Sequence, residues 1–173
     1  SIIASGIDSI ISFLISLIII LIPVKSFGLI EVDITRGNLN PLPIAVSPLP
    51  IDEESRKNFQ NILEKKNIGS EISLIVENNL KVSGLYNPLN KDAFLQEPDI
   101  ANLKPRFEDW NLIKAQALIT GKVSYVEEKL RVEFRLWDLT AAKEMIALAF
   151  TTTPSNWRRV AHIISDKIYE RLT

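Results

Sequence analysis

The stretch "LRVEFRLWDL", residues 130–139, has the most regular strand pattern in the chain. Its apolar side chains alternate with charged and aromatic ones: Leu130, Val132, Phe134 and Leu136 against Arg131, Glu133, Arg135 and Trp137. Successive side chains of a strand point to opposite faces of a sheet. The pattern therefore predicts a strand with one buried face and one solvated face.

Neighbouring stretches predict a strand on either side of it. Strand periodicity runs from about residue 117 to residue 126, and a tight turn at residues 127–129 leads into the central strand. After a turn at residues 140–143, residues 144–152 predict a third strand, which Thr153-Pro154-Ser155 ends. A final helix is then predicted from a single apolar face, made of Trp157, Ala161, Ile164, Ile168 and Leu172.

Two further helices are predicted earlier in the chain. One has Ser70 as its N-cap and ends at Ser83-Gly84, where Gly84 takes the left-handed conformation. Its apolar face consists of Ile68, Ile72, Ile75, Val76 and Leu80. The other begins at Phe107 and has Glu108 and Asp109 in its first turn, where the helix dipole favours them. Its apolar face consists of Phe107, Trp110, Ile113 and Ala117.

Shorter elements complete the predicted fold. Prolines around Ile44-Ala45-Val46 indicate a strand that is brief or lies at a sheet edge. Residues 85–89 predict a short strand, residues 51–66 a solvated loop or helical turn, and residues 90–105 a long surface loop. We therefore expect an α/β fold, α+β-like in its second half, with a mixed β-sheet of about five to six strands and two to three packed helices.

Composition narrows the possible functions. The chain has 173 residues, which suits one domain plus a short appendage. Its net charge of −1, from 20 basic and 21 acidic residues, provides no strong field for nucleic acid or an anionic membrane surface. The absence of cysteine excludes disulfides, zinc–thiolate sites and thiol nucleophiles.

The start of the chain has the composition of an export signal. In "SIISFLISLIIILIPVKSFG", residues 9–28, the apolar run from Ile10 to Ile22 is shorter than the span of about 20 residues that a transmembrane helix needs. Ser26 and Gly28 fit a cut after Gly28, so we expect a signal peptide at residues 1–28 and a domain at residues 29–173. Because the first 22 residues lack Lys and Arg, an uncleaved anchor is the main alternative, and a buried helix is the least favoured.

The segment "LIEVDITRGN", residues 29–38, follows the proposed cut and alternates as a strand does. Ile30, Val32 and Ile34 share one face. A strand near a free chain end either completes its own sheet or adds to the sheet edge of a partner. Periodicity alone leaves both possibilities open.

Motifs for catalysis are missing from the sequence. His162, the only histidine, has Arg158 and Asp166 one helical turn away and is predicted to be solvated between these charges. The acidic clusters at residues 52–54, 108–109 and 127–128 fit a loop, a helix start and a hairpin turn. We expect no catalytic residue, no cofactor and no metal site, and the pair Arg158-Arg159 beside Trp157 gives only weak support for nucleic-acid binding.

Five separated blocks carry a resemblance to a known family. They are "VDITRGNLNPLPIAV", "VSGLYNPL", "FEDWNLIKAQALITGKV", "LRVEFRLWDL" and "WRRVAHIISDKIYERLT", in this order. Over about residues 30–173 the chain resembles the N-terminal domain of TolB proteins, the periplasmic components of Tol–Pal systems, and most closely the alphaproteobacterial members.

The resemblance implies a periplasmic, non-enzymatic adaptor that works through protein–protein interaction. In the family, the N-terminal segment engages TolA, and a C-terminal β-propeller binds Pal. The system supports outer-membrane integrity, protein import and envelope constriction during the cell cycle and cell division. For this chain, the resemblance implies a TolA-binding segment made of Leu29, Ile30, Glu31, Val32, Asp33, Ile34, Thr35 and Arg36. After signal cleavage no membrane insertion is expected, and no nucleic acid is expected as a partner.

Departures from the family pattern leave alternatives open. Asn79-Leu80 stands where the family commonly has Asp-Leu, and Ser47-Pro48-Leu49 where it commonly has Phe. Blade-like repeats of about 40 residues are absent, so a Pal contact is expected only if a longer product contains a propeller. A truncated or decayed TolB fragment without independent function is the first alternative, and a small enzyme or nucleotide binder on an α/β scaffold is the second.

Overall fold

A five-stranded mixed sheet is the centre of the computed structural model, which describes residues 30, 40–62 and 67–173. The strand order is β2-β1-β3-β4-β5, with β1 (Leu42–Val46), β2 (Tyr86–Pro88), β3 (Ala117–Val126), β4 (Lys129–Asp138) and β5 (Lys143–Thr152). β1 pairs in parallel with β2 and β3, whereas β4 pairs antiparallel with β3 and β5. The predicted α/β class with a mixed sheet of five to six strands is confirmed.

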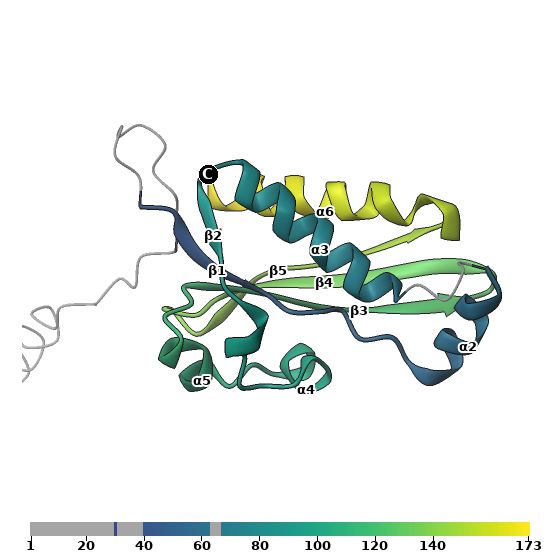
Figure 1. Ribbon diagram of the computed structural model, residues 1–173, viewed down its shortest axis with the longest axis horizontal. Helices are drawn as coiled ribbons and strands as arrows, with labels where there is room; N and C mark the ends of the chain where they lie inside the picture. The colour runs from purple at the N-terminus through teal and green to yellow at the C-terminus, as the bar shows by residue number, and fades with distance from the viewer. Residues whose placement is uncertain (1–29, 31–39, 63–66) are drawn as a thin grey trace, which may run out of the picture.

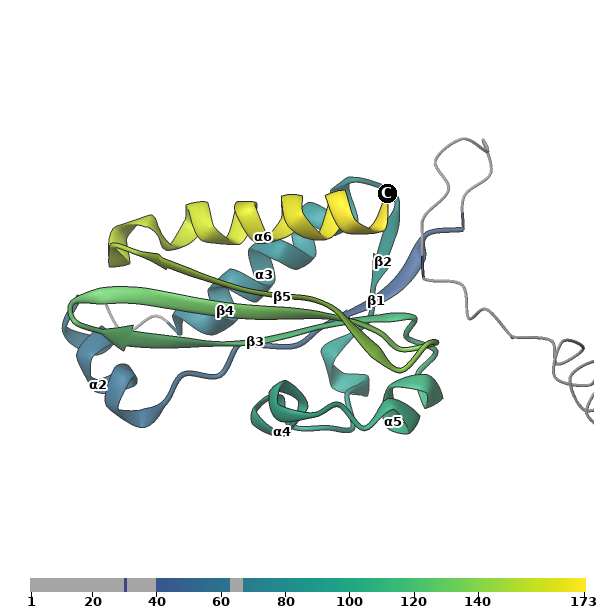
Figure 2. The same cartoon turned by 180° about the vertical axis from the view of Figure 1, so that it is seen from behind.

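Helices cover both faces of this sheet (Figure 1; Figure 2). Two long helices, α3 (Ile68–Val82) and α6 (Trp157–Leu172), lie together on one face. The short helices α4 (Pro98–Leu103) and α5 (Phe107–Leu112) lie on the other face, and α2 (Glu53–Ile62) lies at the far end of β3. The described residues thus hold five α-helices rather than the two to three predicted.

The predicted meander of β3, β4 and β5 is present. Strand β3 pairs with β4 from Ala117↔Asp138 to Val126↔Lys129. Glu127 and Glu128 both have positive φ, at 50° and 61°, as a two-residue turn between twisted strands requires. The apolar residues of β4 and α6 that were predicted to be buried all lie in the main core, between the sheet and the pair α3–α6.

The second face of β4 is only partly solvated, contrary to the sequence pattern. Trp137 lies on this face and is buried, because α5 covers the end of the strand. Its ring meets Phe107 edge to face, with centroids 6.1 Å apart, and its Nε1 donates a hydrogen bond to Thr120 Oγ1 at 2.9 Å. A second, smaller core therefore forms under α4 and α5, from Ala45, Ala101, Trp110, Ala115, Leu118, Trp137 and Leu139.

Strand β1 was predicted to be brief or to lie at a sheet edge. It is brief, with five residues, and it lies inside the sheet. Proline is tolerated there because of the position where β3 begins. The first residue pair between the two strands is Ile44↔Ala117, so β3 begins opposite the residue that follows Pro43. The missing N–H of Pro43 therefore removes no ladder bond, and its carbonyl still accepts one from Gln116 N–H at 2.9 Å.

Two polar stretches contain short helices: residues 51–66, predicted as a solvated loop or helical turn, and residues 90–105, predicted as a long surface loop. Asp52 caps α2, because its two carboxylate oxygens accept from the Ser55 N–H at 2.7 Å and the Ser55 hydroxyl at 2.8 Å. Residues 90–105 hold α4 and a turn of 3₁₀ helix, Lys91–Ala93. The predicted helix from Phe107 is shorter than expected, since it ends at Leu112 and Lys114 takes a positive φ of 61°.

Helix α3 begins earlier than its predicted cap. Asn67, rather than Ser70, is the N-cap, and its side chain accepts from the Ser70 N–H at 3.1 Å. Gly69 sits in the first turn against the backbone carbonyl of Leu49, where a Cβ atom would overlap that oxygen. The predicted stop is confirmed, because Gly84 has a φ of 74° directly after the C-cap Ser83.

Replacing Gly69 tests this close approach. Alanine normally favours a helix over glycine by about 1 kcal/mol. We expect Gly69→Ala instead to lower the free energy of unfolding by about 2 kcal/mol, because the Leu49 carbonyl has to move. Urea denaturation measures the change. Asn78→Ala, an exposed position on the same helix, is the matched control and should be neutral or stabilising; equal effects of the two substitutions would contradict the contact.

The buried hydroxyl of Tyr86 should make the protein less stable at alkaline pH. Its ring is buried, its hydroxyl has no hydrogen-bond partner, and burial, with a smaller contribution from Tyr169, raises its pKa to about 12 from 10.0. The unfolded chain ionises near pH 10 while the folded protein stays neutral, so the stabilisation is complete below pH 10 and is lost as the pH rises to about 12. The loss amounts to roughly 2 to 3 kcal/mol.

Unfolding free energies measured from pH 8 to pH 12 test this expectation. Tyr86→Phe should remove most of the alkaline decline and cost little at pH 8, because the hydroxyl it deletes is unpartnered. Tyr169→Phe, at an exposed ring that meets Tyr86 edge to face, is the matched control and should keep the decline. If the alkaline decline in unfolding free energy persists in Tyr86→Phe, groups other than Tyr86 cause it.

Candidate partner-binding site

Of the predicted partner-binding residues, only Ile30 lies among the described ones. Its N–H donates a hydrogen bond to Asp138 Oδ2 at 3.1 Å, and its side chain is half-buried against the main core. The other predicted residues, 29 and 31–36, lie outside the described part of the chain, as does the predicted signal peptide. The observed contact therefore places one point of the segment at the end of β4.

Asp138 is the residue that positions Ile30. It is the last residue of β4 and is fully buried. While Oδ2 accepts from Ile30, Oδ1 accepts from the Ala141 N–H at 2.8 Å, in the turn that leads to β5. Hydrogen bonds from backbone N–H groups to a carboxylate are stronger than those between neutral groups. Here they satisfy both buried carboxylate oxygens of Asp138.

Sequence reasoning missed the role of Asp138. An aspartate that follows a strand and precedes a turn commonly accepts a bond from a nearby backbone N–H, and this local signal was present. The bond to Ile30, by contrast, joins residues 108 positions apart. No local pattern predicts such a contact.

His162 lies on α6 and is exposed, as predicted, and its side chain contacts a residue of α3. Its Nδ1 accepts from the Asn79 side-chain amide at 2.9 Å, and the same amide donates to Ser165 Oγ at 3.0 Å. The guanidinium of Arg158 lies over the Trp157 ring at 4.3 Å, so the hydrogen bond of the histidine is to Asn79 and not to this neighbouring charge. Asp166 shares a groove of about 260 Å³ with the histidine.

The groove beside His162 lacks an activated nucleophile. Ser165 Oγ accepts from Asn79 and donates to the Ala161 carbonyl at 2.9 Å, so its proton is directed into its own helix. A serine nucleophile would instead donate to the histidine. The contacts of Asn79, His162 and Ser165 thus join the two helices and form no catalytic triad.

The acidic clusters have structural roles. For Asp52, burial raises the pKa, but the Ser55 hydrogen bonds outweigh burial and hold the pKa below its ordinary value. Asp109 pairs with Arg106 at 2.6 Å, and Glu127-Glu128 forms the hairpin turn. Within the described residues, no group of three or more His, Cys, Asp or Glu side chains is placed to hold a metal ion.

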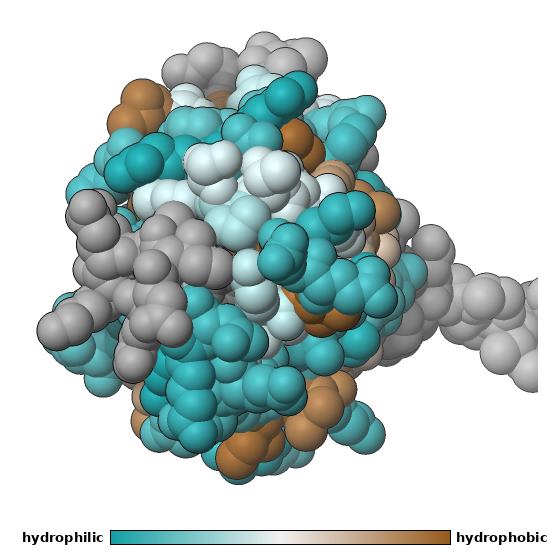
Figure 3. All heavy atoms as spheres, turned by 90° about the vertical axis from the view of Figure 1, so that its right-hand side faces the viewer, coloured by the Kyte–Doolittle hydropathy of each residue, from teal (hydrophilic) through white to brown (hydrophobic). Residues whose placement is uncertain are grey.

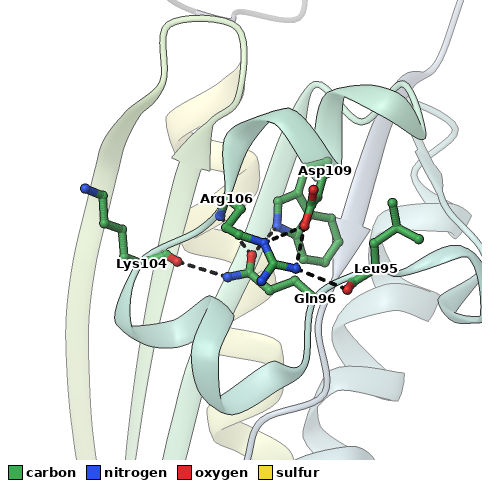
Figure 4. A network of polar contacts seen from close by, with 6 residues as sticks. Leu95, Gln96, Lys104, Arg106 and Asp109 are labelled. Carbon is green, nitrogen blue, oxygen red and sulfur yellow. Dashed lines mark hydrogen bonds and ion pairs between the residues drawn. The ribbon is translucent and has the colours of Figure 1, made fainter.

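A polar network around Gln96 holds the α4–α5 segment together (Figure 4). The buried Gln96 donates to the Lys104 carbonyl at 3.1 Å, and its Oε1 accepts from the Arg106 N–H and from Trp110 Nε1, both at 2.9 Å. Arg106 also reaches Asp109 and, at 3.4 Å, the Leu95 carbonyl. Both ends of the Gln96 amide are engaged with groups of this segment, which indicates a structural rather than a ligand-binding role.

The end of the molecule that carries the β3–β4 turn is largely hydrophilic (Figure 3). Apolar side chains on this face are scattered among polar ones. A polar groove of about 510 Å³ lies between α2 and the end of β3, lined by Asp52, Glu54, Ser55, Asn58, Ser124, Tyr125, Val126 and Glu127. No helix among the described residues has the length and apolar character needed to cross a membrane.

Substitution of Asp138 tests the anchor. Asp138→Ala leaves two backbone N–H groups without acceptors and should lower the free energy of unfolding by about 2 to 4 kcal/mol. Hydrogen exchange at the Ile30 and Ala141 amides should accelerate together. Asp138→Asn, which keeps one acceptor oxygen, should have a smaller effect, and Asp166→Ala, at an exposed carboxylate, should change stability by less than about 0.5 kcal/mol. Unchanged exchange at Ile30 in Asp138→Ala would contradict the anchor.

Comparison with known proteins identifies the relatives of this chain. The chain is 74% identical over 157 residues to the Tol-Pal system protein TolB of Pelagibacter ubique. This match covers 91% of the chain but 35% of the relative, so the chain spans about a third of the length of that protein. The relative is thus a component of a Tol–Pal system.

A solved structure has the same fold. The crystal structure of TolB from Acinetobacter baumannii superimposes with a TM-score of 0.61 at 20% identity, over 83% of this chain and 31% of that one. At this identity the likeness concerns the fold alone. The family model described as the TolB amino-terminal domain matches residues 30–145, which is more than half of the chain. The chain therefore belongs to the TolB amino-terminal domain family.

Proposed function

We propose that this domain is a periplasmic, non-catalytic adaptor of a Tol–Pal system and that its N-terminal segment recruits a TolA-like protein. The family membership and the 74% identity to a Tol-Pal system protein support the choice of system. The observation that carries the choice of segment is the bond from Ile30 to Asp138, because it fixes one point of the segment on the folded domain.

Residues 29–36 are suited to strand addition. Their apolar and polar side chains alternate, so one face can pack on a partner while the backbone groups pair with a sheet edge. Ile30 already packs its side chain on the main core and is fixed through its N–H. In the proposed complex the residues after Ile30 supply the pairing strand, and the domain supplies its attachment point.

An adaptor role agrees with the chemistry of the described residues. His162 joins α3 to α6, Asp52 caps α2 and Gln96 holds the α4–α5 segment. Each of these three polar groups is thus engaged in a structural contact. These contacts are consistent with the proposal that the domain works by binding a partner.

In the cell, the adaptor would act in the envelope. Export through the predicted signal at residues 1–28 would deliver it to the periplasm. There, together with the remainder of a longer TolB product, it would support outer-membrane integrity and envelope constriction at division. Contact with Pal is proposed only for a product that includes a propeller.

Deletion of the segment tests the proposal. The C-terminal domain of TolA, immobilised, should retain the wild-type chain and lose it when residues 31–36 are removed. This deletion keeps Ile30 and its bond to Asp138, so the domain should unfold at the wild-type urea concentration. Unchanged retention would exclude the segment from TolA binding.

A pair of matched variants separates the two faces of the segment. Val32→Ala with Ile34→Ala removes apolar contacts of the proposed pairing face, and should weaken retention by about tenfold or more. Glu31→Ala with Thr35→Ala, on the opposite face, should leave retention close to wild type. The reverse result would show that the polar face carries the binding.

A further inference from the structure

The two edges of the sheet differ in how they are protected. Strand β2 is three residues long and includes Pro88, and short edge strands with proline resist pairing with other chains. Strand β5 is ten residues long and, among the residues that the structure describes, pairs with β4 alone. It forms the edge of the sheet (Figure 1; Figure 2), so within the described part of the chain its outer row of backbone N–H and C=O groups faces no further strand.

The middle of β5 lacks the residues that usually guard an edge. From Met145 to Thr152 it contains no charged residue and no proline. Its two charged residues, Lys143 and Glu144, lie beyond an irregularity in the pairing: Leu136 faces Ile146, whereas Trp137 faces Glu144. Leu148, at the centre of the uncharged stretch, is 40% exposed.

We propose that this edge pairs with β5 of a second copy of the chain, antiparallel and about a twofold axis at Leu148. The sequence Ile146-Ala147-Leu148-Ala149-Phe150 is nearly symmetric about its centre. Antiparallel self-pairing places Ile146 opposite Phe150, Ala147 opposite Ala149, and Leu148 opposite itself. Large apolar residues therefore meet large ones, and small residues meet small ones.

The faces of the sheet agree with this register. Ile146, Leu148 and Phe150 pair with buried residues of β4, so they share the face that α3 and α6 cover. A twofold axis perpendicular to the sheet preserves this face, and residues directly opposite in antiparallel strands project to the same side. The apolar row thus continues from one copy into the other, and the Phe150 ring, stacked on Phe134 with centroids 6.1 Å apart, gains Ile146 of the second copy as a neighbour.

The opposite face and the charges also permit the pairing. Ala147 and Ala149 form the floor of a shallow groove of about 210 Å³, between Glu133 and Arg135, and present no bulk to a second strand. Lys143 and Glu144 lie outside residues 146–150, so no like charges face each other in the paired stretch. The inference rests on β5 alone and is independent of the proposed Tol–Pal role.

A single introduced cysteine tests the axis directly. The chain contains no cysteine. In an antiparallel pair, residues directly opposite have Cα atoms about 4.5 to 5.5 Å apart, within the range that a disulfide spans. Under mild oxidation, Leu148→Cys in the full chain should become a covalent dimer. Leu74→Cys, on α3 and 50% exposed, is the matched control and should cross-link at least tenfold more slowly.

Charge variants provide a second, reversible test by sedimentation equilibrium. The wild-type chain should show a mass that rises from monomer to dimer with concentration. Leu148→Lys and Leu148→Glu should each stay monomeric, because each places like charges opposite one another. A mixture of the two should dimerise again, whereas Leu74→Lys should behave as the wild type does.

The outcomes distinguish self-pairing from its alternatives. A wild-type chain that stays monomeric, with equal cross-linking of Leu148→Cys and Leu74→Cys, would overturn the proposal. So would a dimer that Leu148→Lys leaves intact, because it would use another face. If Leu148→Lys and Leu148→Glu are monomeric but their mixture fails to dimerise, the twofold axis at Leu148 is wrong. Loss of folding in a variant would appear in its circular dichroism, and Leu148→Cys, nearly the same in polarity, then carries the test.

Discussion

The pairing of β3 with β4 is the constraint on which the rest of the fold depends. Every residue from Ala117 to Val126 has a partner in β4, so the register of the sheet is fixed over its longest pair. A shift by one residue would move the whole apolar row of β4 to the other face. Because the register is fixed, α3 and α6 have a single apolar face on which to bury their stripes, and β1 has a defined edge of β3 to join in parallel.

Polar contacts then fix the segments that apolar packing leaves adjustable. The hydrophobic effect is non-directional, whereas hydrogen bonds require particular distances and angles. Gln96 fixes the irregular chain around α4 and α5, Asn79 joins α3 to α6, and Asp138 holds both Ile30 and the turn into β5. Each of these side chains acts where an irregular segment meets a regular element. In a chain without cysteine, such contacts take the place of covalent links.

Periodicity predicted the elements whose partners lie close in sequence, and tertiary context decided the others. The meander, α3 and α6 have clean patterns of two or about 3.6 residues, and the structure confirms them. Trp137 follows the solvated row of its strand but is buried, because α5 covers that end. Pro43 indicated an edge, yet the late start of β3 makes an interior place tolerable. The sequence of α2 is mostly polar and charged, so periodicity alone left open a loop or a helical turn there, and Asp52 caps the helix that forms.

The candidate binding segment shows the same division between local and distant information. Its alternation is a local pattern, whereas its attachment to Asp138 depends on the folding of a strand 108 residues away. This attachment matters for recognition, because ordering a free chain end on binding costs conformational entropy. Because Ile30 is already fixed at the end of β4, part of this conformational entropy is lost when the domain folds and not when the partner binds. A partner strand would then meet a segment that is attached at a defined point, which favours some pairing registers over others.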